Sequence, residues 1–465
     1  MKKLIPILIA LNLILLKCDT DNDVIDIINI DQNKSELFIP EIIDTMGDET
    51  SIELTMQATE TEFFKGVFSN TYGYNGNFLG PTLRVYNNQS ITLRTNNRIG
   101  EPSTIHKHGL HVPGSVDGGP HQKIDSGNSR TEILNIDQEA STNWYHPHLM
   151  GLNAEHVYKG LAGMLIVEDE NSLSLGLPNE YGVNDIPLIV QDRLFVEGVM
   201  TYTMDHRRGY LGNTILVNGT VGAYKNVPMG WVRFRILNGS NARFYDFKFE
   251  DNRSFEVIAT EGGFLESPVS VKNLEVWPGE RFEIMVNFND PLAVKLIAYS
   301  TNRGQSESFE IIEFRPDENQ SSNGQLPVQL NRIDSYAPSE VINTREFRFN
   351  MDGVEGGMMG INGVAMNMNV INERVQKNIL ERWVISSFDG KHPFHLHGAS
   401  FLVLSMNGNE VPLHEQGWKD TVKVDDEAEI LVQFEFEADD KNPYMYHCHI
   451  LEHEDMGMMG QFTVE

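Results

Sequence analysis

Cysteine is scarce in this chain of 465 residues, which contains only Cys18 and Cys448. Cys18 follows an N-terminal apolar segment typical of an export signal, so it would be cleaved off or lipidated. Either outcome excludes an intramolecular disulfide. A lone thiol is a hazard in an oxidising compartment unless the protein uses it, and Cys448 is therefore the first candidate for a functional residue.

Positive charge is also in short supply. The chain has 36 lysine and arginine residues against 66 aspartate and glutamate residues, which gives a formal net charge of -30. This excludes nucleic acid as a partner, because phosphate binding needs a basic surface. The acidity favours solubility in an exposed compartment, and the alternative interpretation is attraction of metal cations.

Long stretches of helical periodicity are missing as well. The sequence instead contains short apolar and β-branched segments separated by turn signals such as Asn-Gly. A chain of this length exceeds a single hydrophobic core and predicts two to four domains. We therefore expect an all-β protein with strands near Val85–Thr95, Trp231–Leu237, Phe282–Val286, Trp383–Ser386 and Ile430–Phe436.

The N-terminus resembles a targeting segment. Lys2 and Lys3 precede the apolar run Leu4–Leu16, which is short for a membrane span and fits the core of a signal peptide. Cys18 stands where bacterial lipoproteins carry their lipidated cysteine, although Lys17 departs from the small residue that this motif prefers. Two readings stay open, a lipoprotein signal and an ordinary signal peptide with an incidental cysteine. Both predict that the mature protein leaves the cytoplasm.

Three Asn-Gly pairs mark an internal repeat. Asn75, Asn218 and Asn362 each precede a glycine and then an apolar strand, and they are 143 and 144 residues apart. A period of this size indicates repeated domains, which we interpret as three β-sandwiches. The expected organisation is a signal peptide at 1–18, an acidic tether at 19–45, domains at 46–172, 180–315 and 339–465, and a linker at 316–338.

Histidine is concentrated in four short groups that hold ten of the 15 histidines. Each group contains a His-X-His step, and side chains two residues apart on a strand point to the same face. Four such pairs can therefore direct eight imidazoles at one place, and imidazole binds copper, zinc, iron or nickel. Closed zinc sites use four ligands, which argues against zinc. The groups are His106-Lys107-His108, His146-Pro147-His148, His392 with His395 and His397, and His447-Cys448-His449 with His453.

Cys448 distinguishes between the metals. It lies between His447 and His449, so on a strand its sulfur points away from the site that these two histidines serve. It should serve a second site, for which His392, His453 and Met458 are the available partners. Two histidines, one cysteine and a weak axial methionine form the ligand set of a blue electron-transfer copper. The backbone at Cys448 would then connect the two sites.

Several longer motifs resemble the three-domain multicopper oxidases, closest to their bacterial copper-efflux oxidase and laccase branch. They are Gly73–Val85, His106–Pro120, His146–His148, His392–Gly398, Gly417–Val424 and His447–Met459. The resemblance covers nearly the whole chain after the signal. It implies three cupredoxin-like Greek-key β-sandwich domains and an enzyme that oxidises a small reductant and reduces O2 to water.

The resemblance also implies four copper ions and their ligands. The cluster of three coppers would lie between the first and third domains, with the middle domain as a spacer. The type 1 copper would bind His392, Cys448, His453 and Met458; the type 2 copper His106 and His395; one type 3 copper His108, His146 and His449; and the other His148, His397 and His447.

Two acids match the proton-relay residues of the family. Reduction of O2 consumes four protons as well as four electrons, so the cluster needs proton donors nearby. Asp117 follows the first histidine pair, and Glu454 is adjacent to His453. For any single acid the alternative is a solvated surface charge.

Some positions depart from the family pattern. Lys107 stands where tryptophan is usual, and we expect its side chain to point away from the coppers. A short methionine group replaces the long methionine-rich insert of the copper-efflux branch, and it fits either a Cu(I) site or ordinary core and loop packing. Its members are Met351, Met358, Met359, Met366 and Met368; the histidines without a ligand position are His111, His121, His156, His206 and His414.

The substrate stays open between Cu(I), Fe(II), and phenols or aromatic amines. Copper homeostasis or phenol oxidation would be the corresponding roles. Two other functions remain as alternatives, a copper nitrite reductase and a non-catalytic copper-storage protein. The paired histidines on both sides of Cys448 argue against the first, and the bridge between two sites argues against the second. We expect an exported bacterial protein, periplasmic or anchored through lipidated Cys18, and a monomer.

Overall fold

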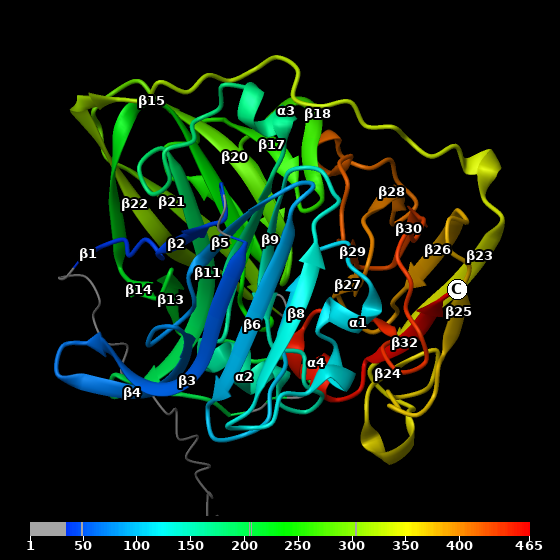
Figure 1. Ribbon diagram of the computed structural model, residues 1–465. Coiled ribbons are helices and arrows are strands. Elements are labelled where there is room, and N and C mark those ends of the chain that lie inside the picture. Colours follow the sequence, from blue (N-terminus) through cyan, green and yellow to red (C-terminus); the bar gives the residue numbers. More distant parts are fainter. Residues whose placement is uncertain (1–33, 48–49, 204, 206, 303–304) are drawn as a thin grey trace, which may run out of the picture.

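The computed structural model describes residues 34–465 except 48–49, 204, 206 and 303–304 (Figure 1). The expected signal peptide and Cys18 lie outside these residues. Within the described ranges, no helix combines the length and apolarity that a membrane crossing would require. Strands dominate the fold, which confirms the all-β expectation.

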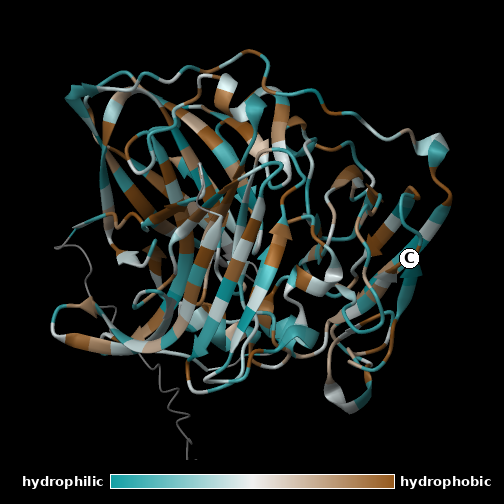
Figure 2. Ribbon diagram, viewed as in Figure 1, coloured by the Kyte–Doolittle hydropathy of each residue, from teal (hydrophilic) through white to brown (hydrophobic). Residues whose placement is uncertain are grey.

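The N-terminal part forms two sheets with a hydrophobic core between them. Along the first half of β6, hydrophobic and hydrophilic residues alternate (Figure 2), as expected for a strand that faces a core on one side. The first sheet has the order β4 (Val67–Tyr74), β3 (Ser51–Phe64), β6 (Ser90–Arg98), β8 (Ser129–Asn135); the second has the order β2 (Ile42–Asp44), β5 (Thr82–Tyr86), β10 (Gly163–Glu168), β9 (Ser141–His146), β7 (His106–His108).

The middle part is one continuous network of 13 strands around the largest core. The long strand β15 pairs with β1 and β22 along its first half and with β11 and β20 along its second half, so it joins both layers. The strands are β1 (Ser35–Glu36), β11 (Asp185–Val196), β12 (Val199–Thr201), β13 (Thr214–Val217), β14 (Thr220–Val221), β15 (Ala223–Asn238), β16 (Tyr245–Phe249), β17 (Phe255–Thr260), β18 (Gly263–Val271), β19 (Asn273–Val276), β20 (Arg281–Phe288), β21 (Val294–Asn302) and β22 (Gln305–Ser321).

The C-terminal part again has two five-stranded sheets with a core between them. One has the order β24 (Gly360–Ile361), β23 (Asn343–Asn350), β26 (Glu381–Ser386), β30 (Glu427–Val432), β28 (Phe401–Met406); the other has the order β25 (Glu373–Val375), β32 (Met459–Val464), β31 (Tyr444–Cys448), β27 (His392–Leu396), β29 (Thr421–Val424). Short helices connect the strands: α1 (Gly114–Asp117), η1 (Pro120–Gln122), α2 (Asn153–Lys159), α3 (Glu170–Ser174), η2 (Pro338–Glu340), η3 (Glu355–Gly357), η4 (Leu413–Glu415) and α4 (Leu451–Asp455).

The three repeated asparagines occupy equivalent positions. Each has a positive φ of 50 to 56°, a conformation that asparagine tolerates better than most residues. Each side chain also bonds one strand in the same way, accepting from a backbone N–H and donating to the carbonyl two residues earlier. These strand partners are Thr55 and Glu53 for Asn75, Ile189 and Pro187 for Asn218, and Arg348 and Glu346 for Asn362.

Folded structure begins earlier than the expected tether allows. Strand β1 pairs with β15, and β2 pairs with β5. Leu37 is buried in the middle core, and Ile43 packs against the N-terminal core, which explains why this segment does not stay free. Strand β22 likewise runs to Ser321, into the expected linker. The strand expected at Val85–Thr95 is two strands, β5 and β6, separated by a turn at Asn87–Gln89.

Candidate metal centre

One candidate site surrounds the buried thiol of Cys448, which ends β31. Its sulfur lies 3.4 Å from Nδ1 of His392 on β27 and 3.7 Å from Nδ1 of His453 on α4. The two imidazole nitrogens are 3.3 Å apart. Cys448 is the one cysteine in the described part of the chain. Burial raises the pKa of its thiol well above the usual value, so ionisation there calls for a bound cation.

A second site begins at the neighbouring residue of the same strand. Nε2 of His447 lies 3.1 Å from Nε2 of His148 and 3.3 Å from Nε2 of His397. His447 and Cys448 therefore face different sites. This is the arrangement that strand alternation predicts.

The second site contains all eight histidines of the four His-X-His pairs. All of these rings are at least 99% buried. The rings of His106 and His397 stack with centroids 3.9 Å apart, and those of His108 and His395 stack at 3.6 Å. The side chains that bring ligand atoms within 4.8 Å of one another are His106 with His395 and His397; His106 with His108 and His146; His148 with His397 and His447; and His108 with His395 and Asp420.

His449 is the member of the pairs that belongs to none of these close groups. The centroid of its ring lies 5.1 Å from that of His108 and 5.6 Å from that of His146. Neither of its ring nitrogens has a hydrogen-bond partner among the described residues. The structure thus places His449 at the edge of the expected His108 and His146 site.

Most cluster imidazoles form a hydrogen bond through the ring nitrogen that points away from the cluster. In five rings Nδ1 donates to a carbonyl or carboxylate oxygen, which leaves the Nε2 lone pair facing the cluster, the usual preparation of histidine as a metal ligand. The buried Nε2 atoms of His106 and His395 have no partner among the described residues, so both are available to bind a metal ion. The acceptors are Asp117 for His106 and His397, Pro147 for His146, Asp420 for His395 and Cys448 for His447.

The protonation of the cluster also suits a metal. Burial, reinforced by the neighbouring imidazoles, lowers the pKa of His146 and His447 well below the usual value. The rings are therefore neutral near pH 7, and neutral imidazole is the form that binds metals. The donor set of buried imidazoles and one thiolate fits copper.

Asp117 contacts two of the cluster histidines. One of its carboxylate oxygens lies 2.7 Å from Nδ1 of His397 and 3.5 Å from Nδ1 of His106. Burial alone would raise the pKa of Asp117, but His397 and His106 hold it well below the usual value. The close approach depends on Gly118, whose φ is +96° and where a Cβ would collide with the carbonyl of Ile105.

Glu454 makes the corresponding contacts on the opposite pair. Its two oxygens lie 3.3 Å from Nδ1 of His148 and 3.3 Å from Nδ1 of His447, and Nδ2 of Asn153 donates to it at 2.8 Å. Burial, with Asp455 nearby, raises the pKa of Glu454 well above the usual value. Both acids expected from the sequence are thus buried against cluster imidazoles.

Two further residues of the site were missed by sequence reasoning. Asp420 accepts from Nε2 of His108 at 3.1 Å, and Arg281 binds both of its carboxylate oxygens at 2.6 and 2.7 Å. Asp420 lies in the motif Gly417–Val424, which supports the family resemblance. The motif did not by itself indicate what Asp420 does. Arg281 begins β20 in the middle part, and no sequence motif around it pointed to the site.

The middle part is therefore more than the expected spacer. Arg281 is fully buried and binds Asp420 of the C-terminal part. It thereby holds in place the carboxylate that accepts from His108. At Gly279 a Cβ would lie 2.8 Å from the ring of His449. Gly279, in the turn before β20, and Arg281, the first residue of β20, thus contribute to the surroundings of the cluster from the middle part.

Residues expected outside the site are outside it. Lys107 is buried with Nζ 2.7 Å from Glu132, so its charge is paired away from the imidazoles. Of the remaining histidines, His206 lies outside the described residues. The others have different partners: Ser400 for His111, Gln461 for His121, Ser103 and Glu101 for His156, and Glu415 for His414.

The methionines divide between different places. Met458 is buried in the same core as Cys448, whose backbone N–H donates to the carbonyl of Met458 at 3.1 Å. In the short methionine group, Met359 and Met351 pack in that core, whereas Met366 and Met368 pack with Met445 and Met459. This division favours packing over a single Cu(I) site.

Comparisons with known proteins point to one family. Sequence profiles described as multicopper oxidase match residues 55–172, 190–311 and 336–465. A multicopper oxidase of Staphylococcus aureus is 36% identical over 94% of each chain, and the cell division protein FtsP of Dickeya dadantii is 36% identical over 94% of this chain and 93% of its own.

Solved structures agree with these matches. A laccase-like multi-copper oxidase, CueO, from an Ochrobactrum species has a TM-score of 0.88 at 38% identity, covering 92% of this chain and 100% of its own. The McoA multicopper oxidase of Aquifex aeolicus has a TM-score of 0.85 at 31% identity, with 93% and 100% covered. The cupredoxin-like fold expected from the sequence is confirmed, and the chain belongs to the multicopper oxidase family of oxidoreductases.

Proposed function

We propose that this oxidase binds four copper ions, takes electrons from a small reductant at the Cys448 site and reduces O2 to water at the eight-histidine cluster. The observation that carries the proposal is the position of Cys448. Its sulfur faces His392 and His453, while the adjacent His447 faces His148 and His397. Copper in the two sites would supply one-electron oxidation at the first and four-electron reduction of O2 at the second.

The ligand assignment follows the contacts. His392, Cys448 and His453 would hold the type 1 ion, with Met458 as the axial ligand. The free Nε2 atoms of His106 and His395 suit the type 2 ion. The two type 3 ions would be held by His108, His146 and His449, and by His148, His397 and His447.

The main chain of β31 provides the route between the sites. An electron that enters at the sulfur of Cys448 crosses one residue of backbone to reach either His447 or His449. Nδ1 of His447 donates to the carbonyl of Cys448 at 3.0 Å, which adds a shortcut along the same path.

Asp117 and Glu454 are proposed as the groups that hold and pass protons. Each is buried within 3.3 Å of a cluster imidazole, and they contact different pairs of rings. Glu454, whose pKa burial raises, can hold a proton beside the place where O2 would be reduced. Asp117, whose pKa is lowered, stays ionised and would pass on protons that it accepts.

The electron donor is proposed to approach the edge of His392. Oδ1 of Asp389 lies 3.7 Å from Nε2 of His392, and the other oxygen accepts from the backbone N–H of Met351 at 2.8 Å. Asp389 is half-buried, with 35% of its side chain exposed, so its charge attracts a cationic donor such as Cu(I) or Fe(II). The Ochrobactrum relative carries oxidase activity towards lignin model compounds and lignosulfonate, which supports phenols as a further substrate class.

The test is direct on the copper-loaded, purified chain. We expect about four copper ions per chain, intense blue absorption with a matching EPR signal, and O2 uptake without nitrite. Cu(I), Fe(II) and a phenol are assayed in parallel, and faster saturable oxidation of Cu(I) would favour copper homeostasis. A variable copper count without O2 uptake would instead support a storage protein. Export, for which the N-terminal residues argue, is tested by cell fractionation.

The axial role of Met458 gives a separate prediction. Replacing it in Met458→Leu removes the weak thioether ligand, which stabilises the oxidised ion more than the reduced one. The type 1 potential should rise by about 59 mV, the tenfold equivalent for a one-electron couple. Redox titration of the blue absorption measures this shift. The control is Met456→Leu, because Met456 packs against the same core from a half-buried position. An unchanged potential in Met458→Leu would remove Met458 from the ligand set.

A further inference from the structure

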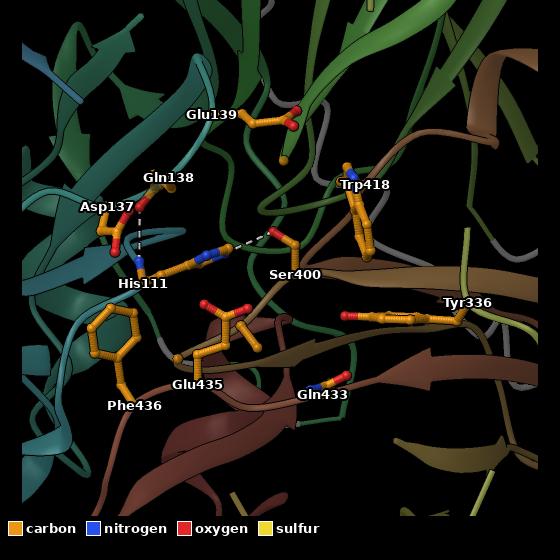
Figure 3. Close-up of a pocket in the computed structure, with 13 residues that line it drawn as sticks. His111, Asp137, Gln138, Glu139, Tyr336, Ser400, Trp418, Gln433, Glu435 and Phe436 are labelled. Atoms are coloured by element: carbon orange, nitrogen blue, oxygen red, sulfur yellow. Dashed lines mark hydrogen bonds between the residues drawn. The ribbon is translucent and has the colours of Figure 1, made fainter. Parts of the chain in front are cut away.

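A cavity of about 220 Å³ lies outside the residues assigned above. It is lined by the segments that follow β7, β27 and β30, by the connections between β8 and β9 and between β22 and β23, and by the loop before β29 (Figure 3). The volume exceeds the ~30 Å³ that one water molecule occupies in the liquid. The cavity therefore has room for a compact organic ligand.

Aromatic side chains form one wall of the cavity. The rings of Tyr336 and Trp418 meet edge to face, with centroids 5.3 Å apart and planes at 77°. Both are half-buried and lie across the cavity from His111, and Phe436 lies on the same side as His111 (Figure 3). Aromatic faces carry negative electrostatic potential and attract organic cations.

Acidic side chains surround the same space. Asp137, Glu139 and Glu435 belong to the lining, and the thirteen lining residues include neither lysine nor arginine. Burial lowers the pKa of His111 to about 4, so its ring is uncharged near pH 7; its Nε2 lies 3.0 Å from the Ser400 hydroxyl. The lining thus combines negative charge with aromatic faces and contributes no lysine or arginine to bind an anion.

The lysine next to Trp418 in the chain has its charge paired with other carboxylates. Lys419 follows Trp418 in the chain, but its Nζ is buried 2.8 Å from Glu415 and 3.1 Å from Glu261. Nor do the acids of the lining suit a bare metal ion, because none of them belongs to a close group of metal-binding side chains within the described residues. A larger, weakly hydrated cation fits the arrangement better.

We propose that this cavity binds a small organic cation, an aromatic or methylated ammonium ion held against Tyr336 and Trp418 with Glu435 as its counter-charge. The lining segments lead within a few residues to His108, His397 and Asp420. A bound cation would therefore sit beside the cluster, at a place separate from the electron entry proposed at His392.

Calorimetric titration of the copper-loaded full chain tests the proposal. Choline and phenyltrimethylammonium are the probes, and 3,3-dimethyl-1-butanol is the uncharged counterpart of choline. We expect saturable binding of both cations and none of the alcohol. Tighter binding of phenyltrimethylammonium would identify an aromatic ammonium ion as the ligand class, and tighter binding of choline an aliphatic one.

Variants separate the aromatic and acidic contributions. Tyr336→Leu removes a ring face and should weaken binding about fivefold, whereas Tyr336→Phe keeps the face and should bind like the parent. Glu435→Gln should also weaken binding about fivefold. Glu60→Gln removes an exposed acid on β3 and should have no effect. Equal binding of the alcohol, no saturable binding of either cation, or unchanged binding in Tyr336→Leu would each overturn the proposal. Because heat is measured without turnover, the result is independent of the oxidase reaction.

Discussion

Cys448→Ser is expected to reduce substrate-driven O2 uptake by at least ~10³-fold, equivalent to about 4 kcal/mol in barrier height. A serine hydroxyl at this buried position cannot replace the thiolate ligand, so the blue absorption should disappear with one copper ion per chain. Electrons would then have no entry to His447 and His449. The O2 electrode and copper analysis on the same sample measure both effects.

The cluster itself should survive this substitution. The eight imidazoles and their hydrogen-bond acceptors are unchanged in Cys448→Ser, so the variant should retain about three coppers. After chemical reduction it should still react with O2, although three coppers hold only three of the four electrons that complete reduction to water requires. Glu60→Gln, on the exposed face of β3, serves as the control with normal turnover. Retained blue absorption in the serine variant would show that the sulfur is not a copper ligand.

The metal site was accessible from the sequence because its geometry is local. Side-chain alternation on a strand places neighbours on opposite faces whatever the rest of the chain does, and His447 and Cys448 follow this rule. The four histidine pairs could be matched to one another because each repeats the same two-residue step. The approximate repeat was visible for a similar reason, since Asn75, Asn218 and Asn362 each need the same left-handed turn.

Arg281 and Asp420 could not be found in the same way. They are 139 residues apart and pair only after the middle and C-terminal sheets have packed together. A single charge in a sequence is normally assigned to the surface, yet both are buried. Removing either one would leave its partner buried and unpaired, which costs about 3–5 kcal/mol.

A second group of buried charges shows the same limit. Lys419 and Lys423 are buried against Glu261, Glu280 and Glu415, which come from the middle and C-terminal parts. The motif Gly417–Val424 contains both lysines and Glu415 lies just before it, but Glu261 and Glu280 are more than 130 residues away in the chain. The pairing of β1 with β15 was unpredictable for the same reason, because parallel pairing depends on a strand nearly 190 residues away.

Glu454→Gln is expected to slow turnover by about 10²- to 10⁴-fold, the usual range for the loss of a positioned proton donor. Glutamine has the same shape and can keep the bond with Asn153, but it cannot hold the proton that the carboxyl passes to the cluster. Reduction of the blue site by substrate should proceed at the parent rate. Reoxidation by O2 should become the slow step, and stopped-flow absorption separates the two.

Asp117→Asn tests the second proton position independently. The amide oxygen can still accept from Nδ1 of His397, which the aspartate contacts at 2.7 Å, so copper should stay bound while turnover falls over a similar range. A structural role for either acid would instead appear as loss of copper or as a changed type 1 potential. Glu454→Asp should recover part of the rate only if a carboxyl proton is required. Full turnover with four coppers in both amide variants would exclude these two acids as proton donors. Slow reoxidation in one variant alone would place the proton path on that side of the cluster, because Asp117 contacts His106 and His397 whereas Glu454 contacts His148 and His447.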